Sequence, residues 1–69
     1  MSAERDDLRE ALKARQLKQV EVARRMGVTP AQLSRLLGGS RAWSLLHARA
    51  FAMATGIPLA VILPEENGV

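Results

Sequence analysis

Lysine and arginine are the residues through which this chain can do most of its chemistry. The 69 residues include ten of them against seven aspartates and glutamates. Their distribution is uneven, because residues 11–64 hold eight bases and a single acid, Glu21. A segment this basic attracts polyanions. The alternative, that these cations only solvate helix surfaces, is equally compatible with the charge taken alone.

The sequence lacks the residue combinations that catalysis and metal binding usually require. No carboxylate pair, no nucleophile beside a base and no phosphate-binding glycine loop stands at a usable spacing, so we do not expect an enzyme. The chain has no cysteine and one histidine, His47, which predicts neither a disulfide nor a metal site. We therefore expect no cofactor and no small-molecule ligand.

Length and composition predict one small all-α domain over residues 1–64, followed by a flexible tail over 65–69. Apolar residues make up 48% of the chain, but just two residues, Trp43 and Phe51, are aromatic. The core must therefore be mostly aliphatic, and an aliphatic core suits packed helices better than sheets. No segment resembles a signal peptide, and the apolar run 57–63 is too short to span a bilayer. We expect a cytoplasmic protein without a membrane partner.

Two short amphipathic segments joined by a tight turn occupy residues 19–39. Their apolar residues recur at helical spacing, as Val22, Ala23 and Met26 in the first and Leu33, Leu36 and Leu37 in the second. Gly27 ends the first helix, because glycine enters the left-handed conformation without steric cost. Thr29 is a good N-cap and Pro30 a good first residue, so the second helix is predicted over 30–37.

This arrangement resembles the helix-turn-helix of the phage repressor and Cro-like family. Counted from Gln19, that family has a small residue fifth, glycine ninth, and apolar residues fourth, eighth, tenth, fifteenth and eighteenth. The corresponding residues are Ala23, Gly27, Val22, Met26, Val28, Leu33 and Leu36. The resemblance implies a five-helix, lambda-repressor-like domain that binds double-stranded DNA and regulates transcription. A helical hairpin without a role in DNA binding is the alternative.

The resemblance also implies which residues meet DNA. The family's main base-contacting positions correspond to Pro30, Ala31 and Arg35, with Gln32 and Ser34 beside them. Arg35 is the strongest candidate, because its planar fork matches O6 and N7 of guanine. Gln32 suits adenine, and Ala31 can make only an apolar contact, such as with a thymine methyl group. The expected phosphate contacts are Lys18, Gln19, Thr29, Ser40 and Arg41.

A first helix is predicted over residues 3–15, capped by Ser2 and facing the motif with Leu8 and Leu12. Many family members carry an arginine at the place of Leu12 that pairs with a glutamate at the place of Leu37. Here both are leucine. We expect an apolar contact instead, which can be neutral or stabilising because two desolvation costs disappear.

Two more helices are predicted after the motif. Ser44 caps the first, which ends at Gly56. Its expected inward residues are Leu45, Ala48, Phe51, Ala52 and Thr55. The second spans residues 59–63, before Pro64.

The C-terminal part has more apolar residues than one small core can bury. All five residues from 59 to 63 are apolar, and tryptophan stands at position 43 where the family usually has proline. We therefore predict a homodimer interface formed by Trp43, Leu46, Ala60, Val61 and Leu63. A two-fold dimer would hold two recognition helices about 34 Å apart, matching an inverted-repeat operator. Alternatively, Trp43 simply covers the core of a monomer.

The leading functional prediction is a transcription repressor that occupies its promoter. A different class is a protein-interaction module, such as an antitoxin or a regulator-binding helix-turn-helix protein, whose arginines would meet an acidic partner. Specific duplex binding that survives excess random DNA and weakens steeply with salt distinguishes the first from the second.

Overall fold

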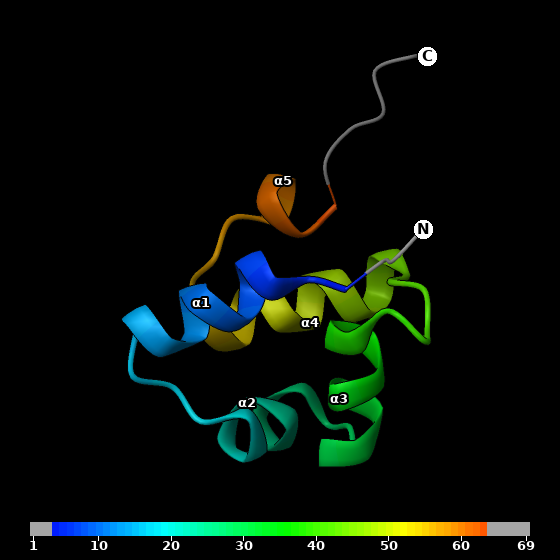
Figure 1. The fold of residues 1–69 in the computed structure, drawn as a ribbon, viewed down its shortest axis with the longest axis horizontal. Helices are drawn as coiled ribbons and strands as arrows, with labels where there is room; N and C mark the ends of the chain where they lie inside the picture. The colour runs from blue at the N-terminus through cyan, green and yellow to red at the C-terminus, as the bar shows by residue number, and fades with distance from the viewer. Residues whose placement is uncertain (1–3, 64–69) are drawn as a thin grey trace.

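The computed structural model describes residues 4–63, and within that range it contains five α-helices and no strand (Figure 1). The helices are α1 (Asp6–Ala14), α2 (Gln19–Met26), α3 (Pro30–Gly38), α4 (Leu45–Thr55) and α5 (Leu59–Ile62). In the view of Figure 1, α4 crosses the middle, with α2 and α3 below it and α5 above. The predicted all-α, five-helix fold is confirmed. None of these helices is long and apolar enough to cross a membrane.

One apolar core joins the five helices. Its buried members are Leu8, Leu12, Val22, Ala23, Leu33, Leu37, Ala48, Phe51, Ile57 and Ile62. Leu12 and Leu37 are 2% and 0% exposed, which agrees with apolar packing in place of a charged pair. Trp43 lies against this core, with its ring centroid 5.2 Å from that of Phe51 and the two planes at 76°.

The ends of α2 and α3 depend on glycines in the left-handed conformation. Gly27 follows α2 with φ 79°, as predicted. Gly38 is the last residue of α3, one position beyond the predicted end at 37, and the left-handed residue is Gly39 with φ 86°. Other residue types strain in this region, so both positions fix where a helix stops.

The predicted start of α1 at residue 3 is wrong. The helix begins at Asp6, and Arg5 occupies the N-cap position without a side-chain capping bond. Ser2, the predicted cap, lies outside the described residues. Asp6 and Asp7 stand in the first turn, where the helix dipole favours negative charge, so acidic residues help to start the helix where a cap does not.

Ser44 caps α4 as predicted, its Oγ accepting a hydrogen bond from the backbone N–H of His47 at 3.1 Å. The predicted burial of Leu45 is wrong, because this first residue of α4 is 54% exposed. The last helix also ends one residue early, at Ile62 rather than 63. The predicted flexible tail, 65–69, falls outside the described residues.

Acid should weaken the fold through Asp7. Its carboxylate accepts two hydrogen bonds from the Arg5 guanidinium, which lowers the pKa of Asp7 below its usual 3.8. A lowered pKa in the folded state adds stability above the unfolded pKa, and that stability disappears as pH falls through the folded pKa. We expect the thermal midpoint of the wild type, followed by circular dichroism from pH 7 to about 2.5, to fall more steeply than that of Asp7→Asn. Parallel curves for the two proteins would contradict this role.

Candidate nucleic-acid interface

The connection between α2 and α3 fixes how the second of these helices is presented. Ala23 is 0% exposed, and its small side chain lets α2 and α3 cross closely. The backbone N–H of Val28 donates to the carbonyl of Ala23 at 3.0 Å, and that of Gly27 donates to Arg24 at 3.2 Å. These two backbone hydrogen bonds, together with the close crossing at Ala23, set the direction in which α3 leaves α2.

A reciprocal pair of hydrogen bonds starts α3. The hydroxyl oxygen of Thr29 accepts from the backbone N–H of Gln32 at 3.1 Å, and Oε1 of Gln32 accepts from the backbone N–H of Thr29 at 3.0 Å. Pro30 is the first helical residue, where its missing N–H costs nothing. The capping role of Gln32 was missed from sequence, although threonine followed three residues later by glutamine is a known signal for it.

The outward row of α3 holds four of the five predicted base-contacting residues. Pro30, Ala31, Ser34 and Arg35 are exposed, while the fifth, Gln32, is half-buried. The opposite side of the helix is anchored in the protein by Leu33, Leu36 and Leu37, each at most 1% exposed. Within residues 4–63 no hydrogen bond or ion pair engages the Arg35 guanidinium, so all of its donors are available.

The loop after α3 folds back onto that helix. The backbone N–H groups of Ser40 and Arg41 both donate to the carbonyl of Arg35, at 3.1 and 3.3 Å. Both loop residues are exposed. Two predicted phosphate contacts are therefore tied through the backbone to the residue predicted to contact a base.

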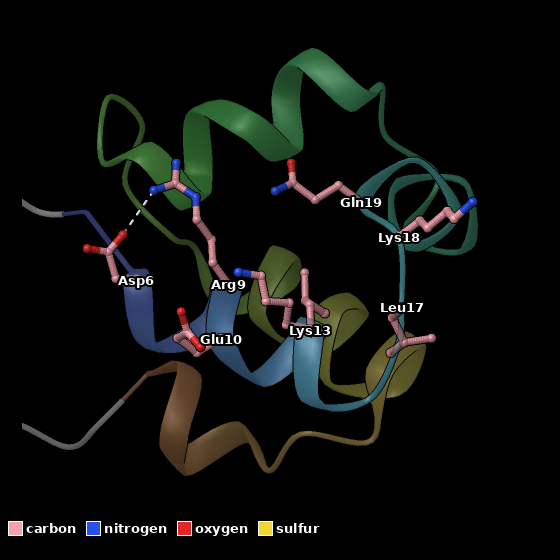
Figure 2. Close-up of a pocket in the computed structure, with 8 residues that line it drawn as sticks. Asp6, Arg9, Glu10, Lys13, Leu17, Lys18 and Gln19 are labelled. Carbon is pink, nitrogen blue, oxygen red and sulfur yellow. Dashed lines mark hydrogen bonds and ion pairs between the residues drawn. The ribbon is translucent and has the colours of Figure 1, made fainter.

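The other predicted phosphate contacts lie at the start of α2. Lys18 is the N-cap residue of α2 and makes no side-chain capping bond. Gln19 is the first helical residue. Both residues line a pocket of about 540 Å³ beside α1, and Figure 2 shows Gln19 pointing into the space between α1 and α3 while Lys18 points away.

This pocket has a mixed lining. Arg9 lies 3.1 Å from Asp6, which offsets its charge, and Glu10 adds a second carboxylate, whereas Lys13 is exposed and adds a cation. Sequence reasoning assigned no role to Lys13, which lines this pocket beside α1. The pocket therefore carries charges of both signs.

The residues predicted to form a dimer interface do not share one environment. Leu46 and Val61 are 76% and 44% exposed, and Ala60 is also exposed. Trp43 and Leu63 are half-buried and pack against the core. On α4, Met53 is 87% exposed and was not predicted to be outward. Most of the free apolar surface near this end therefore lies on α4.

Two variants test the capping role of Gln32. Gln32→Glu keeps an acceptor for the N–H of Thr29, so we expect little change in stability, whereas Gln32→Ala should lose about 1 kcal/mol of stability. The measurement is urea denaturation of both proteins. Equal stability for the alanine and glutamate variants would show that the capping bond contributes nothing.

One family model matches the chain, over residues 8–62, and its description is helix-turn-helix. No curated protein and no solved structure matches. The matched range includes all of α2, α3, α4 and α5 and most of α1, so the similarity extends well beyond the two helices of the motif.

Proposed function

The chain belongs to the phage repressor and Cro-like helix-turn-helix family of DNA-binding transcription regulators, and from that premise we propose that it is a dimeric repressor of an inverted-repeat operator. Repression needs only that the protein occupy a promoter. In this proposal α3 enters the major groove and each protomer contacts one half-site.

The observation that carries the proposal is the exposed row Pro30, Ala31, Ser34 and Arg35 on α3, whose other side is anchored by buried leucines. A helix enters the major groove with its first exposed residues nearest the base edges. Arg35 supplies two parallel donors for guanine, and Ala31 offers a methyl group to thymine. Because Oε1 of Gln32 already accepts the capping bond, a contact with adenine that uses this oxygen must either share it with the cap or break the cap.

Phosphate contacts come from segments on either side of this helix in the sequence. Lys18 and Gln19 precede it, and Ser40 and Arg41 follow it directly. Thr29 can also take part, because its hydroxyl oxygen accepts within the cap while its O–H proton remains available to a phosphate. Contacts of this kind set orientation and contribute most of the salt dependence.

A salt titration on a specific duplex tests the proposal. With Lys18 and Arg41 each neutralising one phosphate in each of two protomers, the logarithm of affinity should fall with the logarithm of salt concentration at a slope of about −3.6. Additional basic residues would steepen it. A flat salt dependence, or binding abolished by an equal amount of random DNA, would contradict a specific regulator.

Self-association should depend on the apolar residues that remain exposed on α4 and α5. We expect Leu46→Glu and Val61→Glu each to raise the dimer dissociation constant by at least about tenfold, because a charge would be buried at the interface. Sedimentation velocity at tens of micromolar measures this. Val20→Glu is a matched control, since Val20 is 50% exposed on α2. A wild type that is monomeric at this concentration would remove the dimer from the proposal.

The exposed apolar side chains of α4 also favour a second candidate, binding to another protein. Leu46 and Met53 are more than three-quarters exposed, α4 has no acidic residue, and Arg49 is exposed on the same helix. Such a surface suits an acidic amphipathic partner. A chain that selects no sequence from random DNA would favour this function over operator binding.

A further inference from the structure

Arg5 joins two ends of the molecule that are far apart in sequence. Its guanidinium donates from Nη1 to the carbonyl of Ile62 and from Nη2 to the carbonyl of Val61, both at 2.8 Å. These carbonyls belong to the last turn of α5, where a helix leaves its acceptors without internal partners. One arginine thus satisfies two acceptors that α5 cannot satisfy itself.

Asp7 holds the guanidinium in this position. The Arg5 Nε lies 3.1 Å from Oδ1 of Asp7, and Nη2 lies 3.0 Å from Oδ2. Two parallel hydrogen bonds between a planar guanidinium and a carboxylate restrict the side chain to one orientation. The Arg5 side chain is 20% exposed, which limits competition from water.

The backbone of the same residue contacts the recognition helix. The N–H of Arg5 donates to the carbonyl of Leu37, in the last turn of α3, at 2.8 Å. Leu37 itself is fully buried in the core. Arg5 therefore contacts the final turn of α3 through its main chain and the final turn of α5 through its side chain.

The short last helix needs such a contact. It has four residues and no side-chain cap, and Ile62 is its one buried residue. A helix of this length is unstable by itself, so its position depends on what it touches. Val61, on the same turn, remains 44% exposed.

We propose that Arg5 fixes the position of α5 relative to α3 by bonding to the last turn of each helix, and that it thereby sets how the exposed side of α5 is offered to a second copy of the chain. The second half of this inference rests on the proposed dimer, whereas the first half concerns one chain. Loss of the guanidinium should loosen α5 while the backbone bond to Leu37 remains.

Amide hydrogen exchange in Arg5→Ala tests the first half. The reporting amides are those of Val61 and Leu63, which donate to Pro58 and Leu59. We expect their exchange to accelerate by about tenfold or more, while the amide of Val22 in α2 is unchanged, because only the local opening becomes easier. Arg15→Ala is the control, since it removes the same charge from an exposed residue of the α1 end. Unchanged exchange at both α5 amides overturns the proposal.

If Arg5→Ala unfolds the whole chain, Arg5→Lys and Asp7→Asn decide the question. The lysine ammonium keeps the charge but lacks the planar guanidinium that donates to the Asp7 carboxylate and to both α5 carbonyls at the same time. Faster exchange confined to α5 in either variant supports the positioning role, and exchange unchanged in both rejects it.

Operator binding tests the second half. Arg5→Ala should weaken binding to a duplex with two half-sites by about tenfold while leaving binding to a single half-site unchanged, because the latter needs no second copy. Equal losses on both duplexes overturn the link to dimerisation. A wild type that binds both duplexes with equal affinity instead rejects the proposed dimer, and the exchange experiment still decides the role of Arg5 within one chain.

Discussion

Arg35→Ala should weaken operator binding by about 1–3 kcal/mol, roughly 5- to 150-fold, and should abolish the preference for one base in each half-site. The guanidinium is exposed, lacks an intramolecular partner within residues 4–63, and projects from a helix anchored by three buried leucines. A bidentate contact with guanine would account for the whole effect. The measurement is a competition titration in which every base is tried at each operator position.

Two further variants make the interpretation specific. Arg35→Lys keeps the charge but loses the planar guanidinium with its two parallel N–H donors. Its affinity should therefore lie between those of Arg35→Ala and the wild type, without the guanine preference. Arg24→Ala removes one charge from α2, where Arg24 is 76% exposed and lies 3.9 Å from Glu21. It should leave base preference intact. If Arg35→Ala kept the wild-type preference, Arg35 would be a phosphate contact and no more.

Phe51→Ala should cost about 3–5 kcal/mol of the free energy of unfolding, because it removes the largest fully buried side chain of the described residues. Phe51 is 0% exposed at the centre of the core, and a cavity would remain in its place. Because a domain of this size has only about 5 kcal/mol or a little more to lose, the variant should be largely unfolded at 37 °C. Urea denaturation checks this at low temperature.

Val20→Ala is the control for that substitution. Val20 is 50% exposed on α2 and lies outside the proposed dimer interface, so its truncation should change stability by less than about 0.5 kcal/mol. Trp43 gives a second signal, because its ring lies against Phe51 and its indole N–H is buried without an acceptor among the described residues. Its fluorescence should shift to the red in Phe51→Ala. A loss below about 1 kcal/mol would contradict the position of Phe51 in the core.

The centre of the fold was predictable because its signals are local. Gly27 ends α2, and Thr29 with Pro30 starts α3, each through its own backbone preference, and these boundaries are confirmed. The family match over 8–62 confirms the resemblance that the apolar spacing indicated. Residue types and short sequence spacings were sufficient to predict these helix boundaries and the family.

The remaining features depend on contacts across the chain. Nothing near Arg5 in the sequence indicates that its side chain meets carbonyls 56 and 57 residues away. The exposure of Leu45 has a similar origin, because helical spacing defines a face but not which neighbouring helix covers its edge. The base contacts, phosphate contacts and dimer residues remain predictions, since they require a second molecule.

Selection of binding sequences from a random DNA pool tests the central claim most directly. The predicted result is one enriched half-site in inverted repeat, with the two centres about 34 Å or one helical turn apart and guanine at a fixed position in each half. Enrichment of a single half-site would agree with recognition by α3 but would exclude the dimer. A pool that yields no enriched sequence, under conditions where the chain is folded, would contradict specific DNA recognition by this protein.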